Sequence, residues 1–431
     1  GAKLMERLEL DSLFIKNILD NKNDYIEDFK IVNDKVNNST AIYKGKPIPF
    51  LYMPKFYRSE DIDRFDWLKN MIISILGKVI DRYIENKDFR KKFHFDQELE
   101  EMILTEHRYN AKIPMARMDI FYREDGSFKF CEINADGSSA MNEDRELARI
   151  LKDSQGVKEL SKKYDIQSFE LFESWVKELI SIYHENNEKD NPTVGIVDFT
   201  DRASLIEFEI FKETFERLGY KAYIIDPREV VYRDNRLFYN DTEIDVIYRR
   251  LVTRDLIERK EEIPDFIKAC KDPNMCIVGS IKTQIIHNKI IFKVLHDEDT
   301  LMLFTEDEVE FVKEHIPYTI ELTDSIDMKK LIENKDYYIL KPMDLYASKG
   351  VYTGLDFTKT EWVELLNECI DSDYLLQDYY TPNKTQLIEF IDNEPVVSTF
   401  NNITGLYVYN EKLYGLYSRI GKNPIISGLH D

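Results

Sequence analysis

Charged and amide side chains alternate along two short apolar segments, residues 115–122 and 128–134. Asp125-Gly126 lies between them and is typical of a two-residue hairpin turn. That turn would place Asp119 opposite Glu132 and Arg117 opposite Asn134. Because side chains alternate between the two faces of a strand, these four polar residues are predicted to share one face. The other face would then carry Met118, Ile120, Cys131 and Ile133, with Cys131 in the core.

Two carboxylates directly opposite each other repel, so we expect a cation between Asp119 and Glu132. Their oxygens and the amide oxygen of Asn134 are hard ligands of the kind that Mg²⁺ takes. The absence of His and Cys from this face argues against zinc. The alternative is a solvated face on which Arg117 bridges the two acids. On the hairpin taken alone, removing either carboxylate is expected to relieve the repulsion and leave the fold intact.

A second group of candidate residues lies far downstream. Residues 337–342 form an apolar strand with Lys341 near its end, and the loop over residues 343–354 contains Ser348, Lys349 and Gly350. A lysine beside a loop with exposed backbone amides is suited to hold phosphate, although the P-loop motif is absent. Lys289 lies upstream, in an expected helix over residues 282–296. For each lysine taken alone, the alternative is an exposed, solvated side chain.

Four further residues have two interpretations. Arg249, Arg250 and Arg254 follow an apolar strand and could bind a substrate carboxylate through paired hydrogen bonds. A surface ion-pair network with neighbouring acids is the simpler interpretation. His287 could act as a base or serve as a structural group.

The elements that position these residues follow from periodicity. Apolar residues at helical spacing predict a mainly helical segment up to about residue 110. After a polar run at residues 185–191, a strand, helix, strand order predicts a small α/β domain. The last third alternates helices with short strands, and Asp392-Asn393 and Asn410-Glu411 are expected to turn its closing hairpins.

The composition limits the partners. The 431 residues include 59 Lys and Arg against 81 Asp and Glu, a formal net charge of −22, which repels nucleic acid and anionic lipid. The 4 cysteines form no CxxC pair, as expected for a reduced protein. No apolar stretch has the length of a membrane span, and residues 1–10 lack the uncharged core of a secretory signal. We therefore expect a cytoplasmic protein without nucleic-acid or membrane partners, of undetermined oligomeric state.

Taken together, the motifs resemble the ATP-grasp superfamily, and within it the circularly permuted branch represented by the synthetase region of glutathionylspermidine synthase. The matching segments are Arg117-x-Asp119, Glu132-x-Asn134-x-Asp136, Asn288-Lys289, Ile339-Leu340-Lys341-Pro342, Leu376-Gln377-Asp378 and Ser418-Arg419. The acidic hairpin precedes the lysines, which is the permuted order. In the loop after Lys341, Gly350 and Gly354 are the only glycines, where relatives are richer in glycine.

The resemblance implies an α+β or α/β protein with an ATP-grasp fold in permuted order. Residues 1–190 would form a helical layer plus the metal-binding hairpin half. Residues 191–280 would form a small inserted α/β domain like the one that precedes an ATP-grasp. Residues 281–431 would form the half that carries the lysines, the lid and the adenine hinge.

The resemblance also implies the cofactors and the role of each residue. ATP would bind with Mg²⁺, two ions of which would bridge its phosphates. The metal ligands would be Asp119, Glu132 and Asn134. Arg117 and Arg419 would lie at the reacting phosphoryl group. ATP would contact Lys289 and Lys341 with its phosphates, Ser348, Lys349 and Gly350 through the lid, and the backbone of Leu376, Gln377 and Asp378 with its adenine.

Such a site implies an ATP-dependent C–N ligase that joins a small-molecule or peptide carboxylate to an amine through an acyl phosphate. Two alternatives stay open. One is a non-catalytic protein of the same fold that binds a nucleotide or a peptide. The other is an ATP-dependent phosphotransferase. The sequence identifies neither the acid nor the amine, and neither glutathione nor spermidine is indicated.

Overall fold

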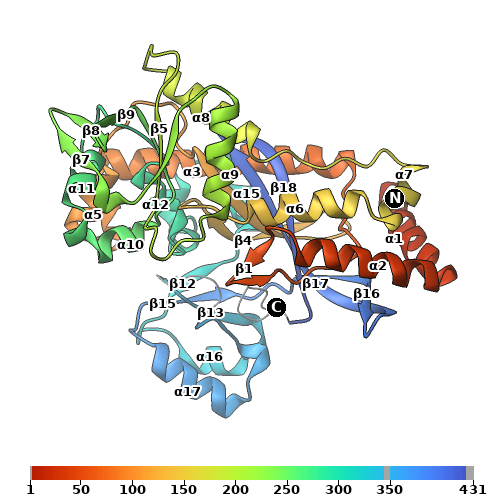
Figure 1. Ribbon diagram of the computed structural model, residues 1–431. Coiled ribbons are helices and arrows are strands. Elements are labelled where there is room, and N and C mark those ends of the chain that lie inside the picture. Colours follow the sequence, from red (N-terminus) through yellow and green to blue (C-terminus); the bar gives the residue numbers. More distant parts are fainter. Residues whose placement is uncertain (1, 344–349, 424–431) are drawn as a thin grey trace.

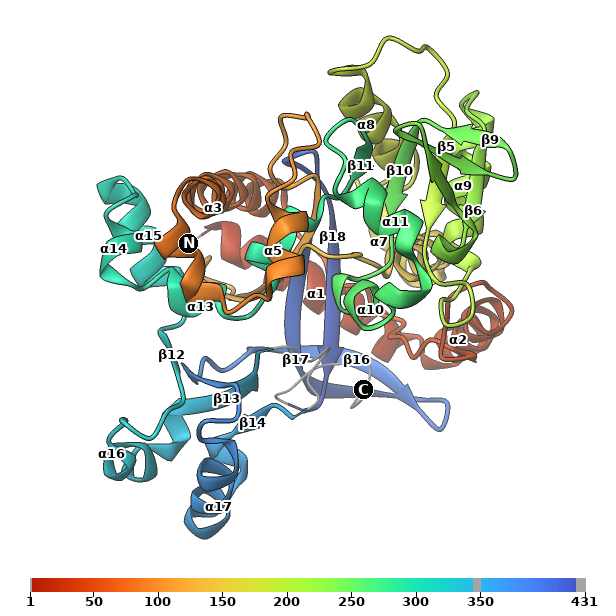
Figure 2. The same ribbon diagram turned by 90° about the vertical axis from the view of Figure 1, so that its left-hand side faces the viewer.

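The computed structural model describes residues 2–343 and 350–423. The chain is a mixed α/β protein in which a long-stranded sheet lies between helical layers, a small parallel domain and a separate lobe (Figures 1 and 2). None of the described helices is long and apolar enough to cross a membrane.

The long-stranded sheet carries the acidic hairpin. Its strand order is β16-β17-β3-β4, and β18 also pairs with β17. The bounds are β3 Met115–Tyr122, β4 Phe128–Asn134, β16 Asn383–Ile391, β17 Glu394–Tyr409 and β18 Lys412–Gly421. Because β17 is long, its first part pairs with β16 and its last part lies between β3 and β18. Both closing hairpins turn where predicted, since Asp392-Asn393 and Asn410-Glu411 have positive φ angles.

Helices from the first half of the chain cover this sheet. Helix α3 packs its apolar face, which includes Leu68, Ile72 and Leu76, into the same core as Met118 and Ile120 of the hairpin. The helices of the first half outside the small domain are α1 Ala2–Asp20, α2 Lys22–Asn37, α3 Ser59–Glu85, α4 Lys87–Arg90, α5 Gln97–Ile103, α6 Met141–Lys152, α7 Gln155–Ser161 and α8 Glu173–His184. Two helices from later in the chain, α14 Glu298–Leu301 and α15 Glu306–His315, also lie outside the small domain and the lobe. A two-stranded ribbon, β1 Ile42–Tyr43 and β2 Lys46–Pro47, follows α2.

The acidic hairpin has the expected pairing at the end that carries the charges. Arg117 lies opposite Asn134 and Asp119 lies opposite Glu132, as predicted.

The turn of this hairpin differs from the prediction. The N–H of Arg123 donates to the carbonyl of Ser127, and Gly126 has a φ of +86°, so the turn has three residues instead of two. Nearer the charges, Cys131 is an extra residue on β4, and this β-bulge restores the expected register. The prediction that Cys131 lies in the core is wrong. As the bulged residue, it is partly exposed and lines a cavity.

The small domain contains the predicted strand, helix, strand unit. Its parallel sheet has the order β11-β10-β5-β6, with β5 Val194–Val197, β6 Ala222–Ile225, β10 Val246–Arg249 and β11 Cys276–Val278. An antiparallel ribbon of β7 Val231–Arg233, β8 Arg236–Tyr239 and β9 Thr242–Ile244 lies beside it. The helices are α9 Ile206–Arg217, α10 Thr253–Glu258 and α11 Pro264–Cys270.

The separate lobe contains a sheet of order β12-β15-β13-β14 with α16 and α17 packed on one face (Figure 2). The bounds are β12 Thr319–Glu321, β13 Tyr338–Pro342, β14 Tyr352–Thr353, β15 Tyr374–Asp378, α16 Met328–Glu333 and α17 Lys359–Cys369. Trp362 of α17 is fully buried in the lobe's own apolar core. The strands that follow, β16 to β18, belong to the long-stranded sheet, so the last third of the chain contributes to two sheets.

The expected helix over residues 282–296 is broken. Two short helices, α12 Gln284–His287 and α13 Ile291–Val294, flank a gap that contains Asn288 and Lys289. Lys289 therefore lies at a bend in the chain and not on a helix face.

Candidate functional site

Two cavities meet at the end of β4. The smaller, of 520 Å³, lies between this strand, the α12–α13 bend and the lobe, and the larger, of 1230 Å³, lies on the side of α6 and the segment that follows α2. Glu132 and Asn134 line both cavities. A molecule in either cavity can therefore reach the same carboxylate.

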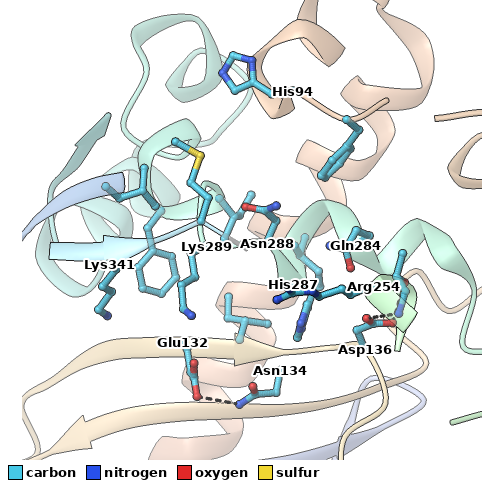
Figure 3. Close-up of a pocket in the computed structure, with 18 of the residues that line it drawn as sticks. His94, Glu132, Asn134, Asp136, Arg254, Gln284, His287, Asn288, Lys289 and Lys341 are labelled. Atoms are coloured by element: carbon cyan, nitrogen blue, oxygen red, sulfur yellow. Dashed lines mark hydrogen bonds between the residues drawn. The ribbon is translucent and has the colours of Figure 1, made fainter. Parts of the chain in front are cut away.

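The two predicted lysines lie across the smaller cavity from the acidic hairpin. Lys341 comes from the lobe and Lys289 from the α12–α13 bend, and both amino groups point towards Glu132 (Figure 3). The amino group of Lys341 lies 3.5 Å from the carbonyl oxygen of Cys131. Three segments that are far apart in sequence thus place two ammonium groups and a carboxylate around one cavity.

The cation expected between the facing carboxylates is Arg419 of β18. Its Nη2 lies 2.9 Å from Oδ2 of Asp119 and 3.8 Å from Oε1 of Glu132. Of the two acids, Arg117 contacts only Asp119, with Nε 3.2 Å from Oδ1. The side-chain amide of Asn134 donates to both carboxylates, at 3.2 and 3.4 Å. A cation does lie between the acids, and it is Arg419 and not the bridging Arg117 of the alternative interpretation, while the Mg²⁺ assignment stays a prediction.

The two carboxylates have opposite electrostatic environments. Burial alone would raise the pKa of Glu132, but Lys289, Arg419 and the other nearby cations lower it to about 2. The pKa of Asp119 is raised by its complete burial, which the arginines beside it only partly offset. Glu132 is therefore the ionised carboxylate that faces the cavities, and Asp119 lies behind it.

Sequence reasoning missed Gly405, which leaves room for the ion pair of Asp119 and Arg117. Gly405 lies opposite Asp119 on β17, the strand between β3 and β18. A Cβ atom at this position would lie 3.0 Å from Oδ1 of Asp119 and 3.2 Å from Cδ of Arg117. Without a side chain here, the ion pair of Asp119 and Arg117 packs directly against the backbone of β17. A glycine in the interior of a strand was the available signal, because it often marks a close approach.

Oxygen ligands at the strand end fit Mg²⁺. Among the described residues, no three His, Cys, Asp or Glu side chains are grouped to hold a metal. Mg²⁺ needs few protein ligands because water and phosphate oxygens complete its shell, so Glu132 with the amide oxygen of Asn134 is a suitable donor set. Both oxygens of Asp119 accept hydrogen bonds from arginines. A cation at Asp119 would have to displace Arg419.

The segment expected to contact adenine is largely engaged in the lobe's sheet. Leu376 and Gln377 pair with β12 on one side and β13 on the other, and the N–H of Asp378 donates to the carbonyl of Tyr318. Leu376 is buried in the lobe's core, Asp378 is exposed, and Gln377 lines the smaller cavity together with Leu375. Leu375 and Gln377 are therefore the residues of this strand that reach the cavity, and the main-chain contact with adenine stays a prediction.

The loop predicted to close over the nucleotide is described only in part. Ser348 and Lys349 lie outside the described residues. Gly350 is described and has a φ of +76°, a conformation that favours glycine.

The arginines at and beyond the end of β10 do not form one surface network. Arg249 and Arg250 are buried and form ion pairs with Asp136 and Glu207, whereas Arg254 forms an exposed pair within α10. The surface-network prediction is therefore wrong for the first two, because the end of β10 faces the interior.

His287 lines the smaller cavity, and its Nδ1 accepts the N–H of Ala135. Burial lowers the pKa of His287, which favours the neutral ring that this hydrogen bond requires.

Comparison with known proteins identifies the fold but no family. No protein-family model matches the chain, and no curated protein sequence matches it. Among solved structures, the chain is similar to a glutathione synthetase-like effector from Globodera pallida in its apo form. The TM-score is 0.61 at 13% identity, over 95% of this chain and 95% of that chain. This likeness shows a glutathione synthetase-like fold, consistent with the expected ATP-grasp architecture, while the permuted order and the inserted domain stay predictions.

Proposed function

We propose that this chain is an ATP-dependent ligase that joins a carboxylate to an amine through an acyl phosphate. The observation that carries the proposal is the meeting of two cavities at one ionised carboxylate, Glu132, with cations on both sides of it. A nucleotide in the smaller cavity and an acid in the larger one would both reach this point. The order of the motifs, with the acidic hairpin before the lysines, supports a circularly permuted ATP-grasp.

The residues around the smaller cavity have the charges that a triphosphate requires. Lys289 and Lys341 would bind its phosphate oxygens as point charges. Glu132 and Asn134 would hold Mg²⁺, and Asp119 would join them if Arg419 moved. When bound, Mg²⁺ neutralises phosphate charge and orients the oxygens of the transferring group.

Arg117 and Arg419 line the larger cavity at the same strand end, so they would face the transferring phosphoryl group and the incoming acid. A carboxylate oxygen forms a bond to the γ-phosphorus, and the bond to ADP breaks. The amine nitrogen then attacks the acyl carbon, phosphate leaves, and the amine loses a proton. The positive charges stabilise the equatorial oxygens in the first step, and no protein nucleophile is needed.

One observation favours a second function, a nucleotide-binding protein without ligase activity. Asp119 is fully buried and both its oxygens are engaged by arginines, which leaves a metal site of one carboxylate and one amide. In that case ATP would bind without turnover.

Thermal unfolding with ATP alone, Mg²⁺ alone and both together tests the binding step, since a ligand of the native state raises its stability. We expect a rise that needs both and that Glu132→Gln weakens. Incubation with ATP, Mg²⁺, a panel of amino acids and short peptides, and hydroxylamine then tests catalysis. Hydroxamate and ADP together support the ligase, ADP with a phosphorylated hydroxyl product indicates a phosphotransferase, and a thermal shift without ADP indicates the binding protein. No shift in any condition would refute the nucleotide site.

A further inference from the structure

The loop after β4, residues 135–140, begins directly after the candidate ligand Asn134 and is fixed by the small domain. Oδ1 of Asp136 lies 2.6 Å from Nη1 of Arg249, and its two oxygens also accept the hydroxyl and the N–H of Thr253 at 2.9 and 2.8 Å. Asp136 is 6% exposed and Arg249 is 3% exposed. Gly137 has a φ of +70°, and a Cβ there would lie 2.6 Å from the carbonyl oxygen of Arg250. The loop is therefore held tightly against the end of β10.

The same arginine also fixes the start of the segment that carries Lys289. Nε of Arg249 donates to the carbonyl of Gly279 at 2.8 Å, and Nη2 lies 3.4 Å from the carbonyl oxygen of Ser280. Ser280 begins the run of chain that leads through α12 to Lys289. A second connection joins these two parts, because Nδ1 of His287 accepts the N–H of Ala135 at 3.2 Å.

Arg249 thus connects the strand end that carries the acidic ligands to the bend that carries a phosphate-binding lysine. We propose that Arg249, through Asp136, is a positioning residue that sets the distance between Asn134 and Lys289 in the nucleotide site. The inference rests on the proposed function, because the distance between Asn134 and Lys289 matters only if both residues bind the same nucleotide and its Mg²⁺. A planar guanidinium that donates in several directions is suited to such a junction, and the ammonium of a lysine cannot reproduce it.

A neighbouring ion pair provides a matched control. Arg250, the next residue, is also buried, and its Nη2 forms an ion pair with Glu207. Glu207 additionally accepts the N–H groups of Met141 and Asn142, at the far end of the loop. This pair fixes the start of α6 without contacting Asn134, Asp136 or the segment from Ser280 to Lys289.

The test compares Asp136→Asn with Glu207→Gln in the full chain. Each change removes one buried charge, keeps the shape of the side chain, and is expected to lower the unfolding temperature without ligand. The second readout is the Mg²⁺ concentration that gives half of the ATP-dependent rise in unfolding temperature, at a fixed ATP concentration. We expect Asp136→Asn to raise this concentration about tenfold, as is typical when a group that orients a metal ligand is lost. We expect Glu207→Gln to change it less than about twofold.

Equal effects of the two variants on the Mg²⁺ dependence, or no effect of Asp136→Asn, would overturn the inference and leave the nucleotide site intact. Absence of any ATP-dependent rise in the wild-type chain would instead refute the proposed function and the inference with it. Arg249→Lys keeps the positive charge but loses the planar guanidinium that donates in several directions. This variant replaces Asp136→Asn in the test if Asp136→Asn does not fold. A wild-type Mg²⁺ dependence in Arg249→Lys would overturn the positioning role.

Discussion

Replacing Glu132 by glutamine is expected to destabilise the protein even when no ligand is present. The pKa of Glu132 falls from 4.5 to about 2 because the attraction of Lys289, Arg419 and the other nearby cations outweighs burial. Its side chain is only 26% exposed, so water screens these attractions weakly. The pKa difference corresponds to about 3 kcal/mol at neutral pH, and to a fall of about 3 °C in the unfolding temperature for a chain of this length.

This expected loss of stability is the opposite of what the hairpin alone predicts, since there the removal of one carboxylate relieves repulsion. Two facing carboxylates repel, but four cations from β3, β13, β18 and the α12–α13 bend surround the pair and leave the cluster positively charged. Removing Glu132 therefore increases the repulsion among the cations. Glu132→Gln should also lose most of the stabilisation that ATP and Mg²⁺ give together.

The assay is chemical and thermal unfolding of the ligand-free proteins at several pH values. Because the folded-state pKa lies below the unfolded one, the stabilisation is complete above pH 4.5 and is lost as the pH falls towards about 2. The difference in the free energy of unfolding between the wild type and Glu132→Gln should become smaller over that pH range. Glu394→Gln, an exposed glutamate on β17, is the control and should change stability by less than about 0.5 kcal/mol. A Glu132→Gln protein as stable as the wild type at pH 7 would refute the reasoning.

Three further predictions follow from the site. Lys341→Met should raise the ATP concentration that gives half of the thermal shift about tenfold, because a charge-assisted phosphate contact is lost. Gly405→Ala should cost about 1–3 kcal/mol and weaken the joint effect of ATP and Mg²⁺, since the new Cβ presses on Asp119. Asp144→Asn should raise stability at pH 8. Burial, and then Glu143, raises the pKa of Asp144 to about 7, so the wild type loses stability as the pH rises from 3.8 towards that value.

Each of these has a control and an opposing outcome. Lys384→Met, at an exposed position of β16, should leave the ATP effect unchanged, and an equal loss would indicate a general charge effect. Gly77→Ala lies on α3 with its nearest neighbour a lysine side-chain carbon at 3.4 Å, so it should be tolerated. A Gly405→Ala protein with wild-type stability would show that the strands can move apart to accept the new Cβ atom. A gain in Asp144→Asn that persists at about pH 4 would show a cause other than ionisation.

Local pattern predicted much of the fold. The hydrophobic period indicated the long helix α3, and the strand, helix, strand order indicated the parallel sheet of the small domain. Asn and Asp at the tips of the closing hairpins indicated turns with positive φ. These features are decided by neighbours in sequence, and a single chain displays them directly.

The errors lie where distant segments act on a local pattern. Asp125-Gly126 favours a two-residue turn, yet the hairpin adopts a longer turn that the bulge at Cys131 offsets. The helix expected around Lys289 breaks because that bend packs against β4 and its loop. Arg249 was expected at the surface, because no residue near it in sequence indicates the buried ion pair that it forms with Asp136.

The sequence by itself indicated that the charged residues of the two strands lie together and that a cation has to lie near them, because strand alternation and Coulomb repulsion are local properties. The exact pairing of Asp119 with Glu132 also needs the bulge at Cys131, which offsets the longer turn. Only the tertiary structure decided which cation it is. Arg419 reaches Asp119 because β18 and β3 lie on the two sides of β17, and Gly405 of β17 leaves room for Asp119 and Arg117. That choice depends on which strands become neighbours, and strand order is fixed by the packing of the whole chain instead of by the residues around the site.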